Sequence, residues 1–294
     1  MQTERPRRSA LYMPGSNDRA LDKARSLPCD VVIMDLEDGV ADEAKGQARS
    51  QIVAEIGKGG YGRRELAVRI NGVGSAWFED DIAAIGPCGA HALQLPKVDG
   101  PDAVRAAAEA LDDAGAPEGM AIWCMIETAR GVLNADVIAG AHPRVGALLI
   151  GGADLTKDLH ALHTPDRLPL LTSIQLVILA ARANGCCVLD SPFFDLSDDE
   201  GFRAACRQGR ELGFDGKTLI HPKTIADANA AFGPTAGELD WARRIKAAHD
   251  AALAQGQGVT LVDGKLVEGL HVAEAQRLVA LAETIAAMEA DSAG

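Results

Sequence analysis

The sequence predicts an α/β fold in which eight parallel strands and the helices between them close into a (β/α)8 TIM barrel. Short apolar runs alternate with longer Ala-rich amphipathic segments along most of the 294 residues. Strict alternation of strand and helix indicates a parallel sheet, and barrels of about 250 residues form single domains. An open doubly wound sheet is the alternative, but no G-x-G-x-x-G fingerprint follows the first apolar run.

The predicted strands are the apolar runs, which in chain order are residues 10–13, 31–34, 66–70, 92–95, 121–126, 147–150, 187–189 and 216–220. The segments between them carry apolar residues at helical spacing. Two of these segments, 103–115 and 173–185, end at glycine, which is typical of a helix C-terminus. We therefore expect residues 1–222 to form the barrel and its catalytic site.

The pattern changes after residue 222. Residues 237–255 predict one amphipathic helix, and two short β runs flank Asp263-Gly264, a common hairpin turn. A last helix is predicted over 272–287. Because residues 223–294 are not needed to close a barrel, we expect a C-terminal helical and hairpin extension that makes an oligomer contact or covers a neighbouring active site.

The composition excludes several classes of partner. A formal net charge of −13 disfavours nucleic acid, which is bound through Lys and Arg on phosphates. No apolar run approaches the ~20 residues of a membrane helix, and the N-terminus lacks a charged-then-apolar leader. The six cysteines form no C-x-x-C pair, as expected for reduced thiols. These features predict a cytoplasmic protein with no membrane contact.

Charged residues follow nearly every predicted strand. Active sites of barrels lie at the carboxyl ends of the strands, so these side chains are expected to converge there. In chain order they are Asp35, Glu37 and Asp38, then Arg69, Lys97, Glu127, Asp154 and Asp190, and finally Lys217 and His221, and the uncharged polar residues Asn71 and Gln94 stand at the same strand ends.

Two of these carboxylates suggest a metal site. Glu127 and Asp154 follow neighbouring predicted strands, which lie about 4.8 Å apart when paired. Both can therefore reach one hard cation, and oxygen ligands suit Mg²⁺ better than zinc. The residues alone leave a second interpretation open, in which Glu127 caps the following helix and Asp154 satisfies a turn.

Eight sequence blocks carry a family resemblance that covers nearly the whole chain. In order they are SALYMPGSNDRALDKA, DVVIMDLEDGV, AVRIN, LQLPKV, MIET, GGADL, FDGKTLIHP and DGKLVEGLHVAEAQRL. They resemble the citrate lyase β-subunit-like (CitE-like) group of the HpcH/HpaI aldolase and malyl-CoA lyase superfamily. The resemblance implies a Mg²⁺-dependent barrel that forms trimers or hexamers. It also implies 3-hydroxyacyl thioester substrates such as malyl-CoA, citramalyl-CoA or a citryl-carrier thioester.

The resemblance also implies residue roles. Glu127 of MIET and Asp154 of GGADL would bind the metal ion directly. Arg69 of AVRIN would face the reacting oxygens and stabilise the thioester enolate, while Glu37 and Asp38 of DLEDGV would hold metal-bound waters or orient Arg69. The implied function is cleavage of malyl-CoA, β-methylmalyl-CoA or citramalyl-CoA into an acyl-CoA and a 2-keto acid such as glyoxylate or pyruvate.

One departure from the family pattern leaves the reaction open. Many malyl- and citramalyl-CoA lyases have an aspartate in the C-terminal block that enters the neighbouring subunit's site as an acid or base, and here Glu268 stands at that position. The alternatives are an acyl-CoA thioesterase, a citryl-carrier lyase, a class II pyruvate aldolase and a non-catalytic carrier-binding subunit.

Binding of the CoA portion is predicted from position alone. Lys97, Arg19 and His221 lie near predicted strand ends, and we expect the two cations to contact phosphates and the histidine to line the thioester or nucleotide pocket. For His221, a hydrogen bond that ties down the loop after its strand is an equal alternative.

Overall fold

The computed structural model describes residues 5–254 and 259–292, which divide into two compact units. One unit is Arg7–Ala231, and the described residues of the other are 5 and 6, 232–254 and 259–292. In the described part of the chain, no helix is both long enough and apolar enough to cross a membrane.

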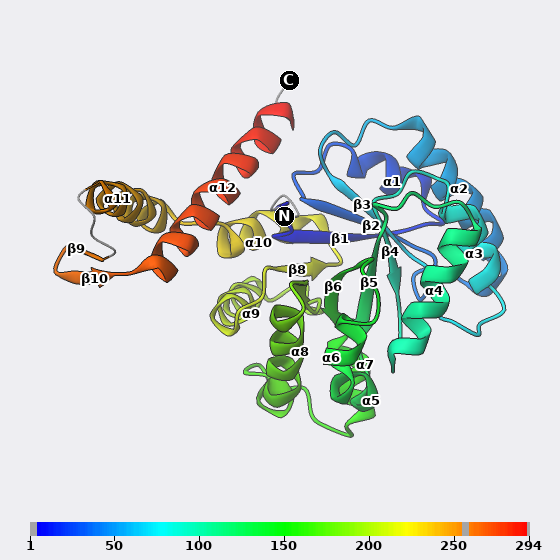
Figure 1. Ribbon diagram of the computed structural model, residues 1–294. Helices are drawn as coiled ribbons and strands as arrows, with labels where there is room; N and C mark the ends of the chain where they lie inside the picture. The colour runs from blue at the N-terminus through cyan, green and yellow to red at the C-terminus, as the bar shows by residue number, and fades with distance from the viewer. Residues whose placement is uncertain (1–4, 255–258, 293–294) are drawn as a thin grey trace. The chain divides into compact units, whose positions relative to one another are not determined.

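The larger unit is the predicted barrel, and its closed parallel sheet confirms the fold class (Figure 1). The strands follow one another around the barrel in chain order. They are β1 (Ser9–Pro14), β2 (Val31–Asp35), β3 (Glu65–Arg69), β4 (Ala92–Leu95), β5 (Ala121–Ile126), β6 (Val145–Ile150), β7 (Cys187–Asp190) and β8 (Gly216–Leu219).

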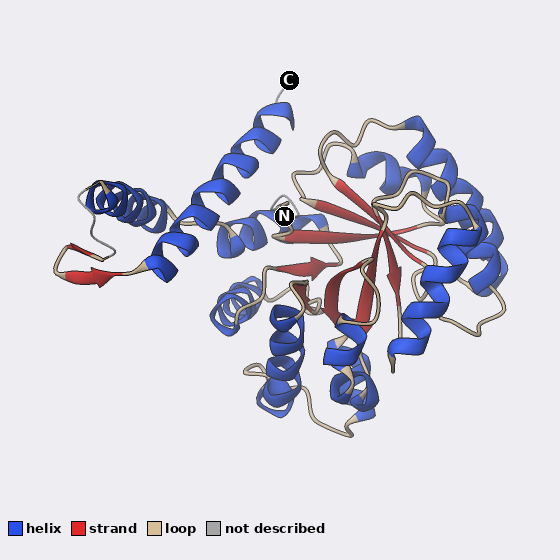
Figure 2. Ribbon diagram, viewed as in Figure 1, coloured by secondary structure: helices blue, strands red, loops and turns tan. Residues whose placement is uncertain are grey.

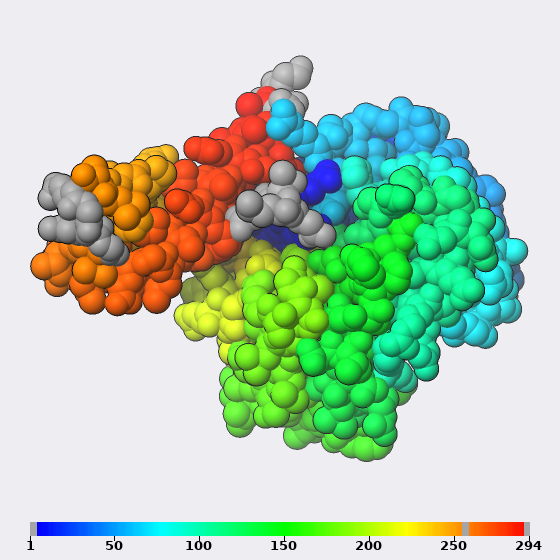
Figure 3. All heavy atoms as spheres, in the orientation of Figure 1, coloured from blue at the N-terminus to red at the C-terminus, as the bar shows by residue number. Residues whose placement is uncertain are grey.

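Helices surround the strands on the outside of the barrel (Figure 2). The α-helices of this part are α1 (Asp18–Ala24), α2 (Lys45–Lys58), α3 (Phe78–Ile85), α4 (Pro101–Asp113), α5 (Ala129–Leu133), α6 (Ala135–Ala139), α7 (Gly152–Asp158), α8 (Leu171–Ala183), α9 (Asp199–Leu212) and α10 (Ile225–Phe232). Short 3-10 helices are η1 (Asp42–Ala44), η2 (Leu168–Leu170) and η3 (Pro222–Thr224). With all heavy atoms drawn, helices and loops hide most of the strands from this side (Figure 3).

Helix α4 illustrates how the sequence pattern produces this layer. Its first residue is Pro101, where a missing N–H costs nothing because the first amides of a helix have no intrahelical partner. The residues that it buries recur at helical spacing and are Val104, Ala107, Ala108 and Leu111. The opposite face is charged, so the helix has one orientation on the sheet.

The strand register places the polar strand ends in one layer. Pro14 pairs with Asp35, Asp35 with Arg69, and Arg69 with Gln94. Ile126 pairs with Ile150, so Glu127 and Gly151 stand together just beyond the sheet. Because these neighbouring parallel strands are paired in register, they end at the same level of the barrel. The polar side chains at their ends therefore lie close together.

The barrel interior combines small and large side chains. Its buried cluster contains Ala10, Val31, Ile33, Ala67, Ala92, Trp123, Met125, Ala147, Leu149 and Leu189. The guanidinium of Arg7 lies 5.1 Å from the centre of the Trp123 ring and pairs with Glu65 at 2.6 Å. The charged pair of Arg7 and Glu65 therefore closes the amino-terminal end of the barrel, opposite the polar carboxyl ends of the strands.

The other unit has the helix, hairpin and helix predicted from the sequence. Helix α11 (Ala236–Leu253) precedes the antiparallel pair β9 (Thr260–Val262) and β10 (Lys265–Val267), and helix α12 (Gly269–Ser292) follows. Asp263 and Gly264 have φ values of 51° and 75°, as an Asp-Gly hairpin turn requires. Residue 255, the predicted end of the first helix, lies outside the described residues.

A buried charge network overturns one expectation about the strand ends. Asp190 and Lys217 do not face the site: Lys217 Nζ lies 2.8 Å from Asp190 Oδ2, and both residues are buried. Arg167 Nη1 binds the other oxygen of Asp190 at 2.6 Å, and Arg167 Nε donates to Gln208 of α9. The pair therefore lies beneath α9, on the helix side of the sheet.

Replacing Asp190 with alanine is expected to lower the free energy of unfolding by about 3–5 kcal/mol, because two buried cations lose their counter-ion. Urea denaturation measures the change. The matched control is Asp22→Ala, which removes an exposed partner of Arg25 and should cost at most about 1 kcal/mol. Similar values for the two variants would contradict the structural role of the network.

Candidate active site

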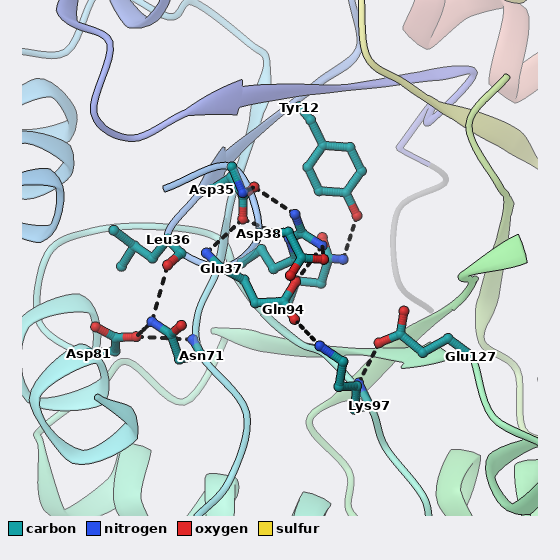
Figure 4. Close-up of polar contacts among 12 residues, drawn as sticks. Tyr12, Asp35, Leu36, Glu37, Asp38, Asn71, Asp81, Gln94, Lys97 and Glu127 are labelled. Carbon is teal, nitrogen blue, oxygen red and sulfur yellow. Dashed lines mark hydrogen bonds and ion pairs between the residues drawn. The ribbon is translucent and has the colours of Figure 1, made fainter. Parts of the chain in front are cut away.

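Charged side chains from the ends of β2, β3, β4 and β5 meet at one end of the barrel (Figure 4). Asp35 and Arg69 are the last residues of β2 and β3, and Lys97 and Glu127 follow β4 and β5. Glu37 belongs to the loop after β2. The structure thus brings together five of the residues that the sequence placed at strand ends.

Arg69 is held by two carboxylates. Its Nε and Nη2 atoms donate to Asp35 Oδ1 and Oδ2 at 2.7 and 2.6 Å, and Nη1 lies 2.6 Å from Glu37 Oε2. Burial lowers the pKa of Arg69, but the bonds to Asp35 and the nearby negative charges raise it by more. The guanidinium is therefore a permanent and oriented positive charge. Asp38 is more exposed and lies 3.8 Å from Arg69.

The backbone of the DLEDG loop fixes Asp35. The amides of Glu37 and Gly39 donate to its two oxygens, each at 2.9 Å. A Cβ at residue 39 would overlap Asp35 Oδ2, so this turn requires glycine. Lys45 Nζ, which sequence reasoning missed, binds the carbonyls of Leu36 and Glu37 at 2.9 and 3.0 Å.

Tyr12 and Gln94 support Arg69 from inside the barrel. The sequence places Gln94 at the end of its predicted strand, whereas Tyr12 is a residue that sequence reasoning missed. The Arg69 guanidinium lies 4.9 Å from the centre of the Tyr12 ring. Gln94 Nε2 donates to the Tyr12 hydroxyl at 2.6 Å, and burial raises the pKa of that phenol. Because β1 reads SALYMP and is buried on both faces, its sequence carries no signal that identifies Tyr12 as an inward-facing polar group.

Lys97 connects two acidic residues. Its Nζ atom binds Glu37 Oε1 at 2.6 Å, and its backbone N–H donates to Glu127 Oε1 at 2.7 Å. Burial lowers the pKa of the Lys97 ammonium, but the bond to Glu37 and the surrounding negative charges raise it overall. The sequence predicts that the Lys97 ammonium contacts a CoA phosphate. In the structure this ammonium binds the Glu37 carboxylate.

Glu127 is an unusually buried carboxylate, with 3% of its surface exposed. Burial raises its pKa to about 8, and the negative charges of Glu37 and Asp154 act in the same direction. The Lys97 N–H opposes this shift without cancelling it. A buried carboxylate beside other carboxylates is stabilised by a bound cation, which compensates both burial and repulsion.

Glycines bring the chain close to Glu127. A Cβ at Gly151 would overlap both Cβ and Oε2 of Glu127, so only glycine permits this approach. Asp154 follows in the first turn of α7 and is half-buried. The GGADL block therefore places a second carboxylate beside Glu127, consistent with the electrostatic effect of Asp154 on its pKa.

These residues fit a divalent cation of the Mg²⁺ type. Among residues 5–254 and 259–292, no three His, Cys, Asp or Glu side chains form a ready-made metal cluster. Mg²⁺ does not need one, because it commonly uses one or two carboxylates and completes its coordination with water and substrate oxygens. Oε2 of Glu127 accepts no hydrogen bond from the described residues, and Asp154 supplies a second oxygen donor.

Two predicted CoA contacts lie outside this cluster. Arg19 is exposed on α1, in the segment after β1. His221 is exposed, and its Nδ1 accepts the Lys223 N–H at 3.1 Å. That bond caps η3. It agrees with the alternative prediction, in which a hydrogen bond of His221 ties down the loop after its strand. Contact of either residue with CoA stays a prediction.

A cleft of about 800 Å³ adjoins Glu37 and Lys97. Its walls are the loops after β2, β3 and β4 and the start of α4. The residues that line it are Glu37, Asp38, Asp42, Lys45, Asn71, Gly72, Val73, Ser75, Trp77, Pro96, Lys97, Asp99, Gly100, Asp102, Ala103 and Ala106. A substrate bound at the carboxylates therefore has room to extend along these loops.

Glu268 belongs to the other unit, between β10 and α12. It is exposed, and its backbone N–H donates to His271 Nδ1 at 3.1 Å. Its predicted entry into a neighbouring subunit's site, like the oligomer and flap roles of residues 223–294, stays a prediction.

The chain is similar to known proteins along nearly its whole length. Residues 8–222 match the HpcH/HpaI aldolase/citrate lyase family model. A (3S)-malyl-CoA thioesterase of Cereibacter sphaeroides is 45% identical over 285 residues, covering 97% of this chain and 98% of that protein. An L-malyl-CoA/beta-methylmalyl-CoA lyase of that organism is 35% identical over 307 residues, covering 96% of each.

A solved structure extends the match to three dimensions. CitE from Mycobacterium tuberculosis, in complex with magnesium, acetoacetate and coenzyme A, is 28% identical with a TM-score of 0.75. The alignment covers 94% of this chain and 97% of that one. The chain therefore belongs to the HpcH/HpaI aldolase/citrate lyase family, as its sequence blocks predict.

Proposed function

We propose that this protein is a Mg²⁺-dependent enzyme that hydrolyses a short 3-hydroxyacyl-CoA thioester, with malyl-CoA as the first substrate to test. The observation that carries this proposal is the 45% identity to a malyl-CoA thioesterase along nearly the whole chain, against 35% for the malyl-CoA lyase. Glu268 supports it too, because it replaces the aspartate that many lyases of the family carry.

The residues of the site have roles in such a reaction. Glu127 and Asp154 would hold the metal ion, which when bound supplies a Lewis acid for substrate oxygens. Arg69, fixed by Asp35 and Glu37, would supply an oriented positive charge to the thioester oxygen and stabilise negative charge as it develops. Hydrolysis joins a water oxygen to the thioester carbon and breaks the C–S bond, and the departing CoA thiolate takes up a proton.

Cleavage of the C–C bond is the second candidate. The oriented Arg69 favours it, because an enolate oxygen needs a fixed positive charge. In that reaction the substrate hydroxyl loses its proton, and the bond between the hydroxyl carbon and the thioester α-carbon breaks. The electron pair forms the enolate, and protonation at the α-carbon yields acetyl-CoA beside glyoxylate. Both reactions place negative charge on the thioester oxygen, so their products separate them.

Malyl-CoA turnover in ¹⁸O-labelled water is expected to give free CoA and malate with one labelled oxygen, and EDTA should abolish it. Mass spectrometry measures both products. Acetyl-CoA and glyoxylate would instead identify the lyase, and acetyl-CoA as a control substrate tests whether hydrolysis follows cleavage. Absence of turnover with malyl-, β-methylmalyl-, citramalyl- and citryl-CoA would contradict the proposal.

The proposal includes an assembly. We infer a homo-oligomer, a trimer or hexamer, in which Glu268 enters the site of a neighbouring copy. We also infer that Arg19 and His221 contact the CoA portion of the substrate. The support is the family membership and the exposure of these three side chains.

A further inference from the structure

Lys97 joins two carboxylates that follow different strands, Glu37 after β2 and Glu127 after β5. Its backbone N–H reaches Glu127 Oε1 at 2.7 Å, and its ammonium reaches Glu37 Oε1 at 2.6 Å. The other oxygen of Glu37 pairs with Arg69. One residue thus contacts the carboxylate proposed to bind metal and the carboxylate that orients the arginine.

The backbone at Lys97 has an uncommon conformation. Its φ is 51°, in the left-handed region that residues other than glycine, asparagine and aspartate seldom adopt. Pro96 has no N–H, so the Lys97 amide is the first donor after β4. The next amide, from Val98, bonds to the Met125 carbonyl of β5 at 3.2 Å. The left-handed turn therefore directs one N–H to a side chain, while the following N–H still bonds to the neighbouring strand.

The consequence falls on Glu127. With Oε1 engaged by the Lys97 N–H, Oε2 accepts no hydrogen bond from the residues described and lies against Gly151. Rotation of the carboxylate would break the bond to Lys97. The orientation of Glu127 thus depends on the backbone conformation of a residue thirty positions earlier.

We propose that Lys97 is a positioning residue whose left-handed backbone, rather than its ammonium, holds Glu127 so that one carboxylate oxygen is directed to a divalent cation. The ammonium acts on a different group, because it contacts Glu37 and through it Arg69. This inference rests on the metal-binding role in the proposed function. The backbone and the ammonium of Lys97 have separable effects. The backbone conformation determines the affinity for the metal ion, and the ammonium determines turnover at saturating metal.

Two substitutions separate the parts. Lys97→Asn and Lys97→Val both remove the ammonium, but asparagine tolerates the left-handed region and β-branched valine does not. Titration of the substrate-free protein with Mn²⁺, followed by electron paramagnetic resonance, measures metal affinity without catalysis. Lys97→Val is expected to bind Mn²⁺ about 10–100-fold more weakly than the wild type, and Lys97→Asn within about 3-fold of it. Both should show a reduced kcat at saturating Mg²⁺.

Equal Mn²⁺ affinities for the two variants would overturn the proposal, whether both match the wild type or both fall. If Lys97→Val does not fold, as judged by circular dichroism, Lys97→Gly replaces it as the second test. Glycine adopts the required φ freely, so wild-type Mn²⁺ affinity is expected, and a tenfold loss in Lys97→Gly and Lys97→Asn alike would contradict the backbone role. A wild-type protein that binds no Mn²⁺ would contradict the proposed metal site itself.

Discussion

Replacing Glu127 with glutamine is expected to lower Mg²⁺-dependent turnover by about 10³-fold, because a bound cation supplies several kcal/mol of transition-state stabilisation and each 1.4 kcal/mol is tenfold. Glutamine has nearly the same shape, and its oxygen can still accept the Lys97 N–H, so the fold should survive. The measurements are thioester turnover as a function of Mg²⁺ concentration and Mn²⁺ affinity of the substrate-free variant. Unchanged turnover at saturating Mg²⁺ would refute the metal role of Glu127.

The pH dependence of stability supplies an independent check on the same variant. Burial raises the pKa of Glu127 to about 8, so the folded metal-free protein binds a proton there more tightly than the unfolded chain does. The stabilisation from this proton is fully present below the pKa of the unfolded chain and is lost as pH rises through about 8. Glu127→Gln lacks this dependence, so in metal-free buffer its stability relative to the wild type should increase between pH 5 and 9.

The matched control for Glu127→Gln is Glu65→Gln. Glu65 is also a buried glutamate, but it begins β3 at the amino-terminal end of the barrel and pairs with Arg7. The Glu65→Gln variant should have a lower free energy of unfolding than the wild type, and the Mg²⁺ dependence of its turnover should be unchanged. A loss of metal affinity in both variants would show that Glu→Gln replacement in the barrel acts through folding.

Replacing Arg69 with lysine is expected to lower kcat by about 10²–10³-fold, the loss typical of removing one preorganised donor to a developing oxyanion. Lysine keeps the charge but not the fork that binds Asp35 at two points and Glu37 at a third. The charge would then no longer be held in one orientation. Steady-state kinetics at saturating Mg²⁺ measures the effect.

Arg8→Lys is the control for this variant. Arg8 binds Asp30 through Nε and Nη2, both at 2.9 Å, so the two arginines share the same bidentate geometry at opposite ends of the barrel. Arg8→Lys should reduce stability and leave kcat within about 2-fold of the wild type. A full kcat in Arg69→Lys, with a stability loss like that of Arg8→Lys, would assign Arg69 a structural role only.

The strand ends show how far sequence reasoning reached into the site. Asp35, Arg69 and Glu127 were expected at one rim because parallel strands present their carboxyl ends at the same edge. That Arg69 binds Asp35 at two points, or that Lys97 binds Glu37, depends on strand register and side-chain rotamers. Neither is encoded in the spacing of residues along the chain.

The misplaced Asp190 and Lys217 have a specific physical cause. Strands β7 (CVLD) and β8 (GKTL) have four residues each and are buried on both faces, so their sequences do not reveal which residues point into the barrel. The same ambiguity concealed Tyr12, which reads as one more apolar residue of β1 but supports Arg69 from inside the barrel. Packing against α9 and against the interior cluster decides these orientations.

The barrel, the family and the end of the barrel where the charged side chains gather follow from the amino-acid sequence. Alternating strands and helices favour a parallel sheet, and eight such units can close it into a barrel. Which charged side chains contact one another depends on the packed molecule. The left-handed turn at Lys97 and the burial of Glu127 arise from contacts between residues far apart in the chain, because burial and hydrogen-bond geometry belong to the packed molecule.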